Sequence, residues 1–345
     1  MNDSRLLVTG ATGMLGSFVA RRAVELGYKV RVLGRANSDR TLIQDLDVEY
    51  VVGDLTQPES LPKALEGVDV GVHCAVQSGD WGPAEKYRAA NVVALEHLLT
   101  AAERAGSIRR WIHVSTLGVY PKGHHHGTDE TAPIDLGGFD GYTQTKAEAE
   151  VVVRRHIDEY DFPAVILRPG FIYGPGERHV IPRLLKRFEQ GLVKFIGDGQ
   201  KVLNNVYVGN FVDAVFLALE HPDAVGEIYN IRDERLVTRD EYLTMVAEYL
   251  GKPHPRHVPL WLAQALVPVV EGVAKLRGRQ DPPLLTRATI KFMAMNLNFS
   301  IAKAKAELGY RPAIDFQPGM RDALDWATGK MTTPRLLRPA DQPSA

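Results

Sequence analysis

A glycine-rich loop near the amino terminus constrains the fold of this chain more than any other feature. Gly10, Gly13 and Gly16 follow an apolar run at residues 6–8 and open a helical pattern that extends to about residue 26. Glycines so placed allow a tight turn and a close approach of the backbone to a pyrophosphate, which then faces the N-terminus of the helix. The sequence therefore predicts a dinucleotide-binding βαβ unit at residues 5–33.

Short apolar runs alternate with helical patterns through the first half of the chain. After the first unit, runs at residues 48–52, 68–76, 110–114 and 164–167 read as strands separated by helices. This alternation is typical of a parallel sheet covered by helices on both faces. We expect an α/β fold, a Rossmann-type doubly wound parallel sheet, with ligands bound beyond the carboxyl ends of its strands.

The pattern changes near Pro175, which suggests a second lobe. We expect residues 1–175 to form the nucleotide-binding domain, with residues 206–220 returning to it. Residues 176–205 and 221–331 would form a smaller C-terminal substrate-binding lobe. The Pro-rich residues 332–345 are expected to be a flexible tail.

Composition excludes several classes of function. The 345 residues contain 41 basic and 42 acidic side chains, so no nucleic-acid partner is expected. Cys74 is the only cysteine, which rules out an intramolecular disulfide and fits a cytoplasmic protein. The apolar residues 258–275 include Gln264, Glu271 and Pro268, which favours a buried helix or a lid over a membrane span, and leaves peripheral membrane contact open.

A tyrosine and a lysine four residues apart suggest acid–base chemistry. Tyr142 and Lys146 would lie one turn apart on one face of a helix. A cation beside a phenol lowers the pKa of the phenol, which makes it a proton donor and acceptor nearer pH 7. By contrast, the run His124–His126 has no acidic or cysteine partner at ligand spacing, so no metal site is predicted.

Several motifs resemble those of one enzyme superfamily. The run Thr-Gly-Ala-Thr-Gly-Met-Leu-Gly at residues 9–16, the strand ending in Ser115 and Thr116, the Tyr142–Lys146 pair and Leu-Arg-Pro-Gly-Phe-Ile-Tyr-Gly-Pro-Gly at residues 167–176 occur in the expected order. Together they resemble the extended short-chain dehydrogenase/reductases over residues 5–330. Stretches at residues 197–200, 204–208 and 282–287 resemble the 3β-hydroxysteroid dehydrogenase-like branch of the epimerase/dehydratase family.

The resemblance implies an activity and a set of catalytic residues. It implies an NAD(P)-dependent oxidoreductase that interconverts a secondary alcohol and a ketone on a small apolar substrate, such as a 3β-hydroxysteroid, a sterol or a 3-oxoalkanoate. Hydride would pass to or from C4 of the nicotinamide, with Tyr142 as the acid or base. Thr116 would bind the reacting oxygen, Lys146 would lower the pKa of Tyr142, and Asn91 would order a water beside Lys146.

The same resemblance assigns the cofactor-binding residues, and one position bears on the choice of cofactor. Gly34 stands where an acidic residue would bond a ribose 2′-hydroxyl, and Arg35 follows it. Because a guanidinium matches a phosphate, we expect NADP(H) to be preferred, with NAD(H) still open. The expected cofactor-binding residues are Gly10, Thr12, Gly13, Met14, Leu15, Gly16, Arg35, Asp54, Leu55, Cys74, Ala75, Ser115, Tyr142, Lys146, Pro169 and Gly170.

Three alternatives to this function stay open. Plant-type dihydroflavonol or cinnamoyl reductases, which share the arginine after the second strand, are one of them. A sugar-nucleotide epimerase or dehydratase would share the catalytic residues and would use a basic cluster, for which Arg178, Arg183, Lys186 and Arg187 are candidates. A catalytically silent NADP-binding regulatory protein belongs to another class, but such members typically lose the tyrosine or the lysine.

The remaining expectations concern the pocket and the assembly. An apolar pocket could be lined by Trp81, Phe139, Phe171 and Tyr173. The resemblance also implies a homodimer in which the helices at residues 84–105 and 142–159 form the interface.

Overall fold

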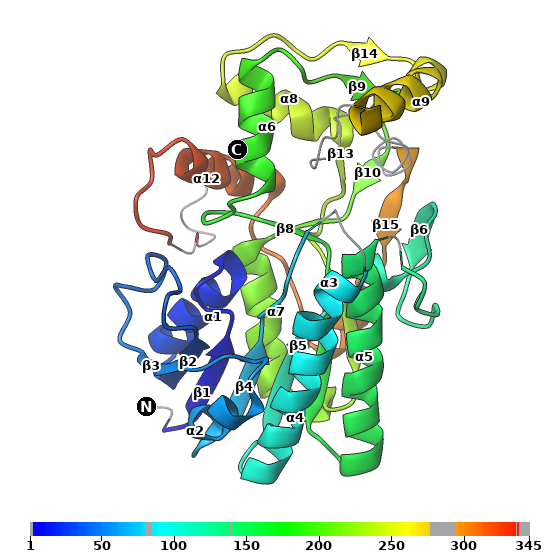
Figure 1. The fold of residues 1–345 in the computed structure, drawn as a ribbon. Coiled ribbons are helices and arrows are strands. Elements are labelled where there is room, and N and C mark those ends of the chain that lie inside the picture. Colours follow the sequence, from blue (N-terminus) through cyan, green and yellow to red (C-terminus); the bar gives the residue numbers. More distant parts are fainter. Residues whose placement is uncertain (1–2, 80–83, 139, 277–293, 336, 338–345) are drawn as a thin grey trace.

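A seven-stranded parallel sheet forms the centre of the molecule (Figure 1). The computed structural model describes residues 3–79, 84–138, 140–276, 294–335 and 337. The strand order is β12-β7-β5-β4-β1-β2-β3, so the Rossmann-type fold class is confirmed. The strands are β1 (Arg5–Thr9), β2 (Lys29–Gly34), β3 (Glu49–Val52), β4 (Val70–His73), β5 (Arg110–Val114), β7 (Ala164–Pro169) and β12 (Ile228–Ile231).

Strand β1 lies in the middle of the sheet and pairs in parallel with β2 on one side and β4 on the other. Strands β2 and β3 extend the sheet from β1 in one direction, and β4, β5, β7 and β12 extend it in the other, so the order of the strands reverses between β1 and β4. In doubly wound sheets this reversal opens a crevice at the carboxyl ends of the two central strands. The glycine loop follows β1 directly, so it lies at that crevice.

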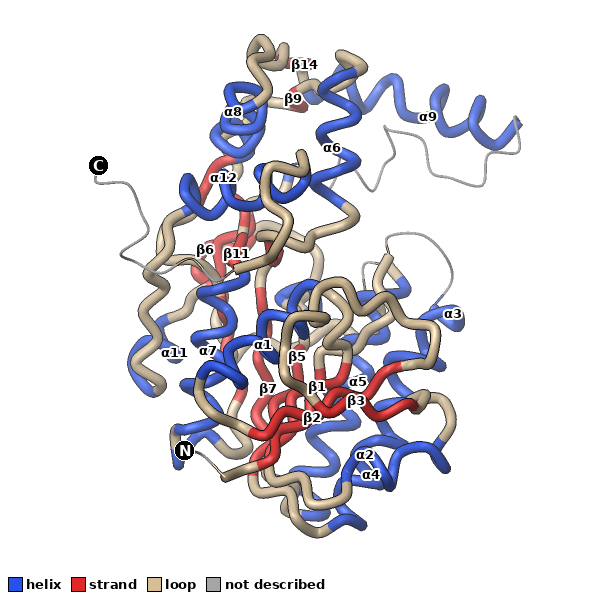
Figure 2. Tube along the Cα trace, turned by 90° about the vertical axis from the view of Figure 1, so that its left-hand side faces the viewer, coloured by secondary structure: helices blue, strands red, loops and turns tan. Residues whose placement is uncertain are grey.

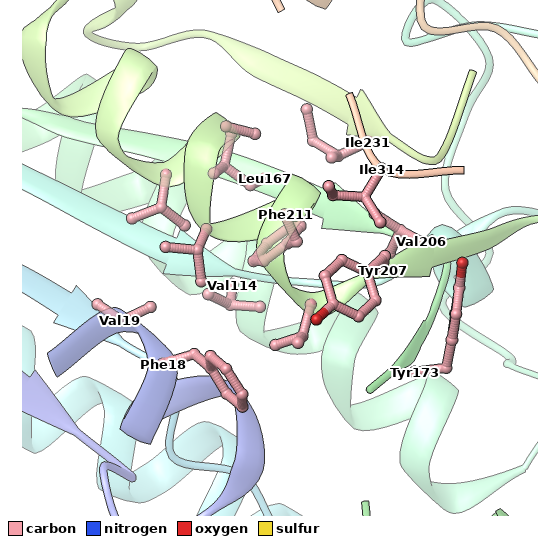
Figure 3. Packing of buried hydrophobic residues seen from close by; sticks show 14 of the residues in the cluster. Phe18, Val19, Val114, Leu167, Tyr173, Val206, Tyr207, Phe211, Ile231 and Ile314 are labelled. Carbon is pink, nitrogen blue, oxygen red and sulfur yellow. The ribbon is translucent and has the colours of Figure 1, made fainter. Parts of the chain in front are cut away.

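Helices cover both faces of the sheet (Figure 2). The helices α1 (Met14–Glu25) and α7 (Val208–Glu220) pack together on one face. Figure 3 shows Phe18 of α1 and Phe211 of α7 packed beside Val114 and Leu167 of the sheet. The other face carries α2 (Leu61–Leu65), α4 (Ala94–Ala105) and α5 (Gly141–Tyr160). Two further segments precede α4: α3 (Ala84–Arg88) and the π-type turn η2 (Ala89–Val93).

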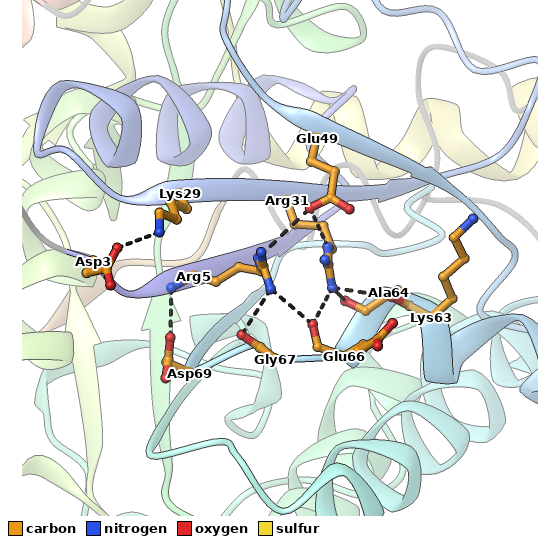
Figure 4. Close-up of polar contacts among 10 residues, drawn as sticks. All are labelled: Asp3, Arg5, Lys29, Arg31, Glu49, Lys63, Ala64, Glu66, Gly67 and Asp69. Carbon is orange, nitrogen blue, oxygen red and sulfur yellow. Dashed lines mark hydrogen bonds and ion pairs between the residues drawn. The ribbon is translucent and has the colours of Figure 1, made fainter.

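Buried polar contacts fasten the amino-terminal edge of the sheet (Figure 4). Arg31 is 5% exposed, and its guanidinium donates to the carbonyls of Lys63, Ala64 and Glu66 at 2.7–3.3 Å. It also donates to the Glu49 carboxylate at 2.9 Å. The carbonyls of Lys63, Ala64 and Glu66 lie at the C-terminal end of α2, where carbonyls have no partner in the next helical turn. The Arg31 cation therefore stabilises the end of this helix. This edge is therefore structural, and the opposite edge carries the candidate site.

A smaller lobe lies above the sheet in Figure 1. Among the described residues, its main part contains two strand pairs and four helices: β9 (Phe195–Ile196) with β14 (His257–Val258), β10 (Val202–Leu203) with β13 (Val237–Thr238), α6 (Val180–Glu189), α8 (Arg239–Tyr249), α9 (Leu260–Leu276) and α12 (Phe316–Ala327). Other elements are β6 (His125–Thr128) paired with β15 (Leu297–Phe299), β8 (Phe171–Tyr173) paired with β11 (Asn205–Tyr207), α11 (Ala302–Glu307), and the short helices η1 (Pro58–Ser60), η3 (Leu117–Val119) and η4 (Pro222–Ala224).

One boundary of the expected lobe is wrong. Strand β12 falls within residues 221–331, yet it pairs in parallel with β7 and completes the main sheet. The physical reason is its apolar sequence, since Tyr229 and Ile231 are almost wholly buried there. Helix α7 packs on the sheet and leads back to this strand as a βαβ crossover.

Helix α9 has one buried and one exposed apolar side. Ala263 and Val267 are buried beside Ile196, whereas Trp261 is 69% exposed and Leu266 is 46% exposed. The expectation of a buried helix is therefore only partly met. In the part of the chain that the structure describes, no helix has the length and apolar character needed to cross a membrane. Peripheral membrane contact stays a prediction.

Candidate active site

The glycine loop after β1 has no room for side chains at Gly10 and Gly16. Gly10 has φ +72°, a left-handed conformation that favours glycine, and a Cβ there would lie 2.6 Å from the backbone nitrogen of Ala75. A Cβ on Gly16 would lie 2.3 Å from the Gly10 carbonyl oxygen. The loop thus packs tightly against β4 and the first turn of α1.

The outer side of the same loop fits the pyrophosphate of a dinucleotide. Gly13 is the N-cap of α1, is exposed, and has no side chain to occupy the free N–H groups of the first turn. Thr12, Met14 and Leu15 flank it and are partly exposed. Backbone N–H groups and the positive end of the helix dipole would hold the phosphates here.

The carboxyl end of β2 is flanked by cations, and a glycine stands there in place of an acid. A Cβ on Gly34 would lie 2.2 Å from the hydroxyl of Tyr50, so an aspartate cannot replace this glycine unless Tyr50 moves. The Tyr50 hydroxyl donates to the Arg35 carbonyl at 2.9 Å, and the Arg40 guanidinium lies 3.6 Å from the centre of the Tyr50 ring. The Arg35 side chain is exposed.

The ends of β3 and β4 bring further expected residues to the same edge. One Asp54 carboxylate oxygen accepts from the N–H and the hydroxyl of Thr56 at 2.9 and 2.8 Å, which holds a local turn. These bonds, with the charge of Arg35 as a smaller cause, lower the pKa of Asp54. Leu55 follows it and is partly buried. At β4, burial raises the pKa of the Cys74 thiol to about 12.

Two hydroxyls meet beyond the carboxyl end of β5. Thr116 is the N-cap of η3, where its Oγ1 accepts from the N–H of Gly118 at 3.1 Å. Tyr142 lies in the first turn of α5, which begins with a capping box between Asp140 and Thr143. The Thr116 side chain lies near enough to the Tyr142 phenol to act on its pKa.

Other groups account for the pKa of Tyr142, so the expected effect of Lys146 stays a prediction. Burial, and then the charge of Asp140, raise the pKa of Tyr142 to about 12, although the nearby Thr116 side chain opposes the change. The Lys146 ammonium instead donates to the carbonyl of Val114, in the sheet. Burial lowers the pKa of Lys146 to about 8 despite the opposing charge of Glu150.

Asn91 lies where it can position neighbouring segments. It sits in the π-type turn η2, and its amide forms a reciprocal pair with the backbone of Gln77, at 2.8 Å to the N–H and 3.1 Å to the carbonyl. The same amide nitrogen donates to Thr145 at 3.1 Å. These contacts fasten the loop after β4 to α5, and the expected role beside Lys146 stays a prediction.

Glu150 and Arg168 form a buried ion pair that sequence patterns do not predict. Each is 3% exposed, and Arg168 donates to both Glu150 oxygens, at 2.9 Å from Nε and 2.6 Å from Nη2. Ser115 also donates to Glu150, and Arg168 donates to the Tyr120 hydroxyl at 2.7 Å. The sequence offers one indication that Glu150 belongs near the site: it follows Lys146 by four residues, one helical turn, and so lies on the same face of the helix.

The end of β7 also reaches this edge of the sheet, and the aromatic residues expected at the pocket differ in their burial. Pro169 is buried, and a Cβ on Gly170 would lie 1.5 Å from the carbonyl oxygen of Asn204, so only glycine fits there. Tyr173 was expected to line the pocket, but it is fully buried in the core and donates to Asp233 at 3.0 Å. Phe171 is partly buried. Trp81, Phe139 and residues 282–287 lie outside the described residues.

The candidate site thus gathers at one edge of the sheet. The glycine loop, Arg35, Asp54, Cys74, Ser115, Thr116 and Gly170 all follow carboxyl ends of parallel strands, and Tyr142 and Lys146 reach that edge from α5. The donors suit a dinucleotide phosphate, and the hydroxyl pair suits proton transfer to a substrate oxygen.

Comparisons with known proteins agree with this geometry. A family model described as the NAD dependent epimerase/dehydratase family matches residues 6–231. The chain is 31% identical to a 2-alkyl-3-oxoalkanoate reductase of Shewanella oneidensis, over 92% of this chain and 85% of that protein. It is 31% identical to a 3 beta-hydroxysteroid dehydrogenase/Delta 5→4-isomerase of Mycobacterium tuberculosis, over 93% and 90%. The dTDP-glucose 4,6-dehydratase of Streptomyces venezuelae, solved with NAD and TYD bound, matches with a TM-score of 0.76 at 25% identity, over 94% and 97%.

Proposed function

Since the chain belongs to the NAD dependent epimerase/dehydratase family, we propose that it is an NAD(P)-dependent oxidoreductase that interconverts a ketone and a secondary alcohol on an apolar substrate. The observation that carries the proposal is the placement of the Thr116 and Tyr142 side chains near each other at the carboxyl end of β5, with Lys146 one turn further along α5. Both named relatives act on oxo or hydroxy groups of largely apolar molecules, which supports the substrate class.

The protonation states favour reduction of a ketone near neutral pH. With a pKa of about 12, the Tyr142 phenol keeps its proton at pH 7 and can deliver it to a substrate oxygen. Thr116 would hold the same oxygen. With a pKa of about 8, Lys146 is mostly charged at pH 7 and can stabilise a phenolate after proton transfer. The nicotinamide, when bound, would supply or accept the hydride.

The sugar-nucleotide alternative has weaker support from the side chains. Its basic cluster begins with Arg178, whose guanidinium is 3.0 Å from the Asp39 carboxylate. Arg183 and Arg187 also have interaction partners already. The dehydratase match at 25% identity nevertheless keeps this alternative in the test as a second substrate class.

Substitution of the phenol tests the function. Tyr142→Phe should lower kcat by about 10²–10⁴-fold, because the proton donor is lost, and should leave cofactor binding almost unchanged. Tyr160→Phe is a matched control, since Tyr160 lies at the exposed end of the same helix. Assays would pair hydroxysteroids, 3-oxo acids and a sugar nucleotide with NADPH and NADH. Turnover retained in Tyr142→Phe would contradict the proposal.

We also propose that NADP(H) is preferred over NAD(H). Support comes from the exposed Arg35 and from the glycine, in place of an acid, at position 34. Arg35→Asp should lower the ratio of kcat/KM for NADPH over NADH by at least about tenfold, since a hydrogen bond to a charged group contributes about 1.5–3 kcal/mol. An unchanged ratio would remove Arg35 from the site.

A homodimer through α3, η2, α4 and α5 is likewise proposed. Val93 and Val151 are 47% and 49% exposed on these adjacent segments, which leaves apolar side chains for a partner to cover. Val93→Asp/Val151→Asp should shift the mass in solution, measured by light scattering, from dimer to monomer. A monomeric native protein would contradict the proposal.

A further inference from the structure

Two imidazoles and a carboxylate converge in the small lobe, far along the chain from the candidate active site. Asp240 lies in the first turn of α8, His257 in β14, and His254 in the segment that precedes β14. One ligand atom from each lies within 4.8 Å of the other two. Figure 1 shows α8, β9 and β14 together at the top of the molecule.

Each imidazole is oriented through the nitrogen that faces away from Asp240. The Nδ1 of His257 lies 3.1 Å from the carbonyl oxygen of Gly197, and the Nδ1 of His254 lies 3.2 Å from that of Pro255. A carbonyl only accepts, so Nδ1 carries the proton in each ring and Nε2 keeps its lone pair. Metal-binding histidines are typically held in this way.

A buried aromatic ring supports both imidazoles. Phe195 is fully buried in β9, and its ring centre lies 4.6 Å from that of His257 and 5.0 Å from that of His254. The backbone pairing of β9 with β14 sets His257 opposite Phe195. The two rings therefore rest on one rigid platform and do not depend on a mobile surface side chain.

The distances suit a shared cation better than hydrogen bonds. Asp240 Oδ1 is 3.5 Å from Nε2 of His254 and 3.8 Å from Nε2 of His257, both beyond the 2.7–3.2 Å of a good N–H···O bond. Two ligands of a tetrahedral zinc ion, each about 2.0–2.1 Å from it, lie about 3.3 Å apart. We propose that Asp240, His254 and His257 bind a zinc ion.

The site would use three protein ligands and leave one position open. The three side chains are 32–47% exposed, so a water from solvent can complete the coordination. The hydroxyl of Thr244 lies 2.7 Å from Nε2 of His254 and must turn away when the metal takes that lone pair. The ion would tie α8 to β14, and through β14 to α9, which begins two residues later.

Metal titration tests this site without any measurement of turnover. Protein without a polyhistidine tag, stripped with EDTA and dialysed, would be titrated with ZnCl₂ by calorimetry, with native mass spectrometry for stoichiometry. We expect one zinc per chain and a higher Tm with zinc, because a ligand that binds only the folded state stabilises it. Cobalt(II) should give the visible absorption of a tetrahedral complex.

Variants locate the ligands. His254→Gln, His257→Gln and Asp240→Asn should each weaken zinc binding by more than about 10–100-fold, the loss that removal of even an outer-shell partner causes. The control is His124→Gln/His126→Gln, which removes another stacked imidazole pair. The proposal is overturned if wild-type protein gives no saturable one-equivalent isotherm, or if the ligand variants bind as wild type. Failure of the oxidoreductase proposal would leave this result unaffected.

Discussion

Two buried carboxylates in this molecule are stabilised in different ways. Glu150, behind the proposed catalytic residues, forms a two-pronged ion pair with Arg168. Asp233, which follows β12, is 2% exposed, and its donors among the described residues are uncharged. Its four donors are the Tyr173 hydroxyl, the side-chain amides of Asn205 and Asn210, and the N–H of Tyr207, at 2.7–3.1 Å.

The four uncharged donors around Asp233, called here the neutral cage, compensate only part of the cost of burying its charge. Burial raises the pKa of Asp233 to about 6, even though all four hydrogen bonds act to lower it. A full counter-charge compensates desolvation more effectively than neutral dipoles do. Asp233 joins β8, β11 and α7, and Asn210 extends the contact to Ile314, so the neutral cage lies where the small lobe meets the sheet. We therefore expect the contribution of Asp233 to stability to depend on pH. The contribution of the Glu150–Arg168 pair should instead depend on both charges being present.

The largest effect should come from removal of the counter-charge. Arg168→Met leaves Glu150 buried without its cation, which should lower the free energy of unfolding by about 3–5 kcal/mol in urea titrations. Arg168→Met/Glu150→Leu should recover most of that loss, because an apolar pair of similar volume needs no compensation. If the double variant is as unstable as the single one, packing and not charge accounts for the effect.

The next effect concerns the pH dependence of the neutral cage. The pKa of Asp233 is about 6 in the folded protein against 3.8 for the ordinary value, so between these limits the folded state binds more protons than the unfolded state. The stability that Asp233 contributes is complete below pH 3.8 and is lost as the pH rises through 6, by about 3 kcal/mol. Urea unfolding from pH 4 to pH 7 should show this decline in wild-type protein and not in Asp233→Asn. Parallel profiles would contradict the assignment.

Local patterns predicted much of the site. Gly10, Gly13 and Gly16 are read from their spacing and from the strand before them, because the loop must turn sharply within a few residues. Tyr142 is singled out by its four-residue spacing from Lys146, and Thr116 by the resemblance to the enzyme superfamily. Their shared edge then follows from the parallel topology alone.

Contacts between distant segments could not be predicted in this way. Glu150 reads as a solvated helix residue, and only the folded chain brings Arg168 to it from the next strand. The donors of Asp233 come from three separate elements, and β12 reads as part of the lobe until it pairs with β7. Nor does the spacing of His254 and His257 reveal Asp240, which joins them through the packing of α8 beside β14.

The smallest effect should come from removing one tyrosine hydroxyl beside each of the two carboxylate sites. Tyr120 bridges Arg168 and Asn230, at 2.7 and 2.8 Å, whereas Tyr173 donates to Asp233. Tyr120→Phe and Tyr173→Phe should each cost about 1–2 kcal/mol at pH 7, since each leaves a buried polar group with one partner fewer.

The two losses should differ in their pH dependence, and this difference tests the comparison of the two carboxylates. The Tyr173 hydroxyl lowers the pKa of Asp233, so it stabilises the charged carboxylate and matters less once that group is protonated. The cost of Tyr173→Phe should therefore shrink between pH 7 and pH 4. The cost of Tyr120→Phe should stay constant, because Arg168 keeps its charge throughout that range. A constant cost for Tyr173→Phe, in the same urea titrations, would mean that Asp233 does not titrate in this window.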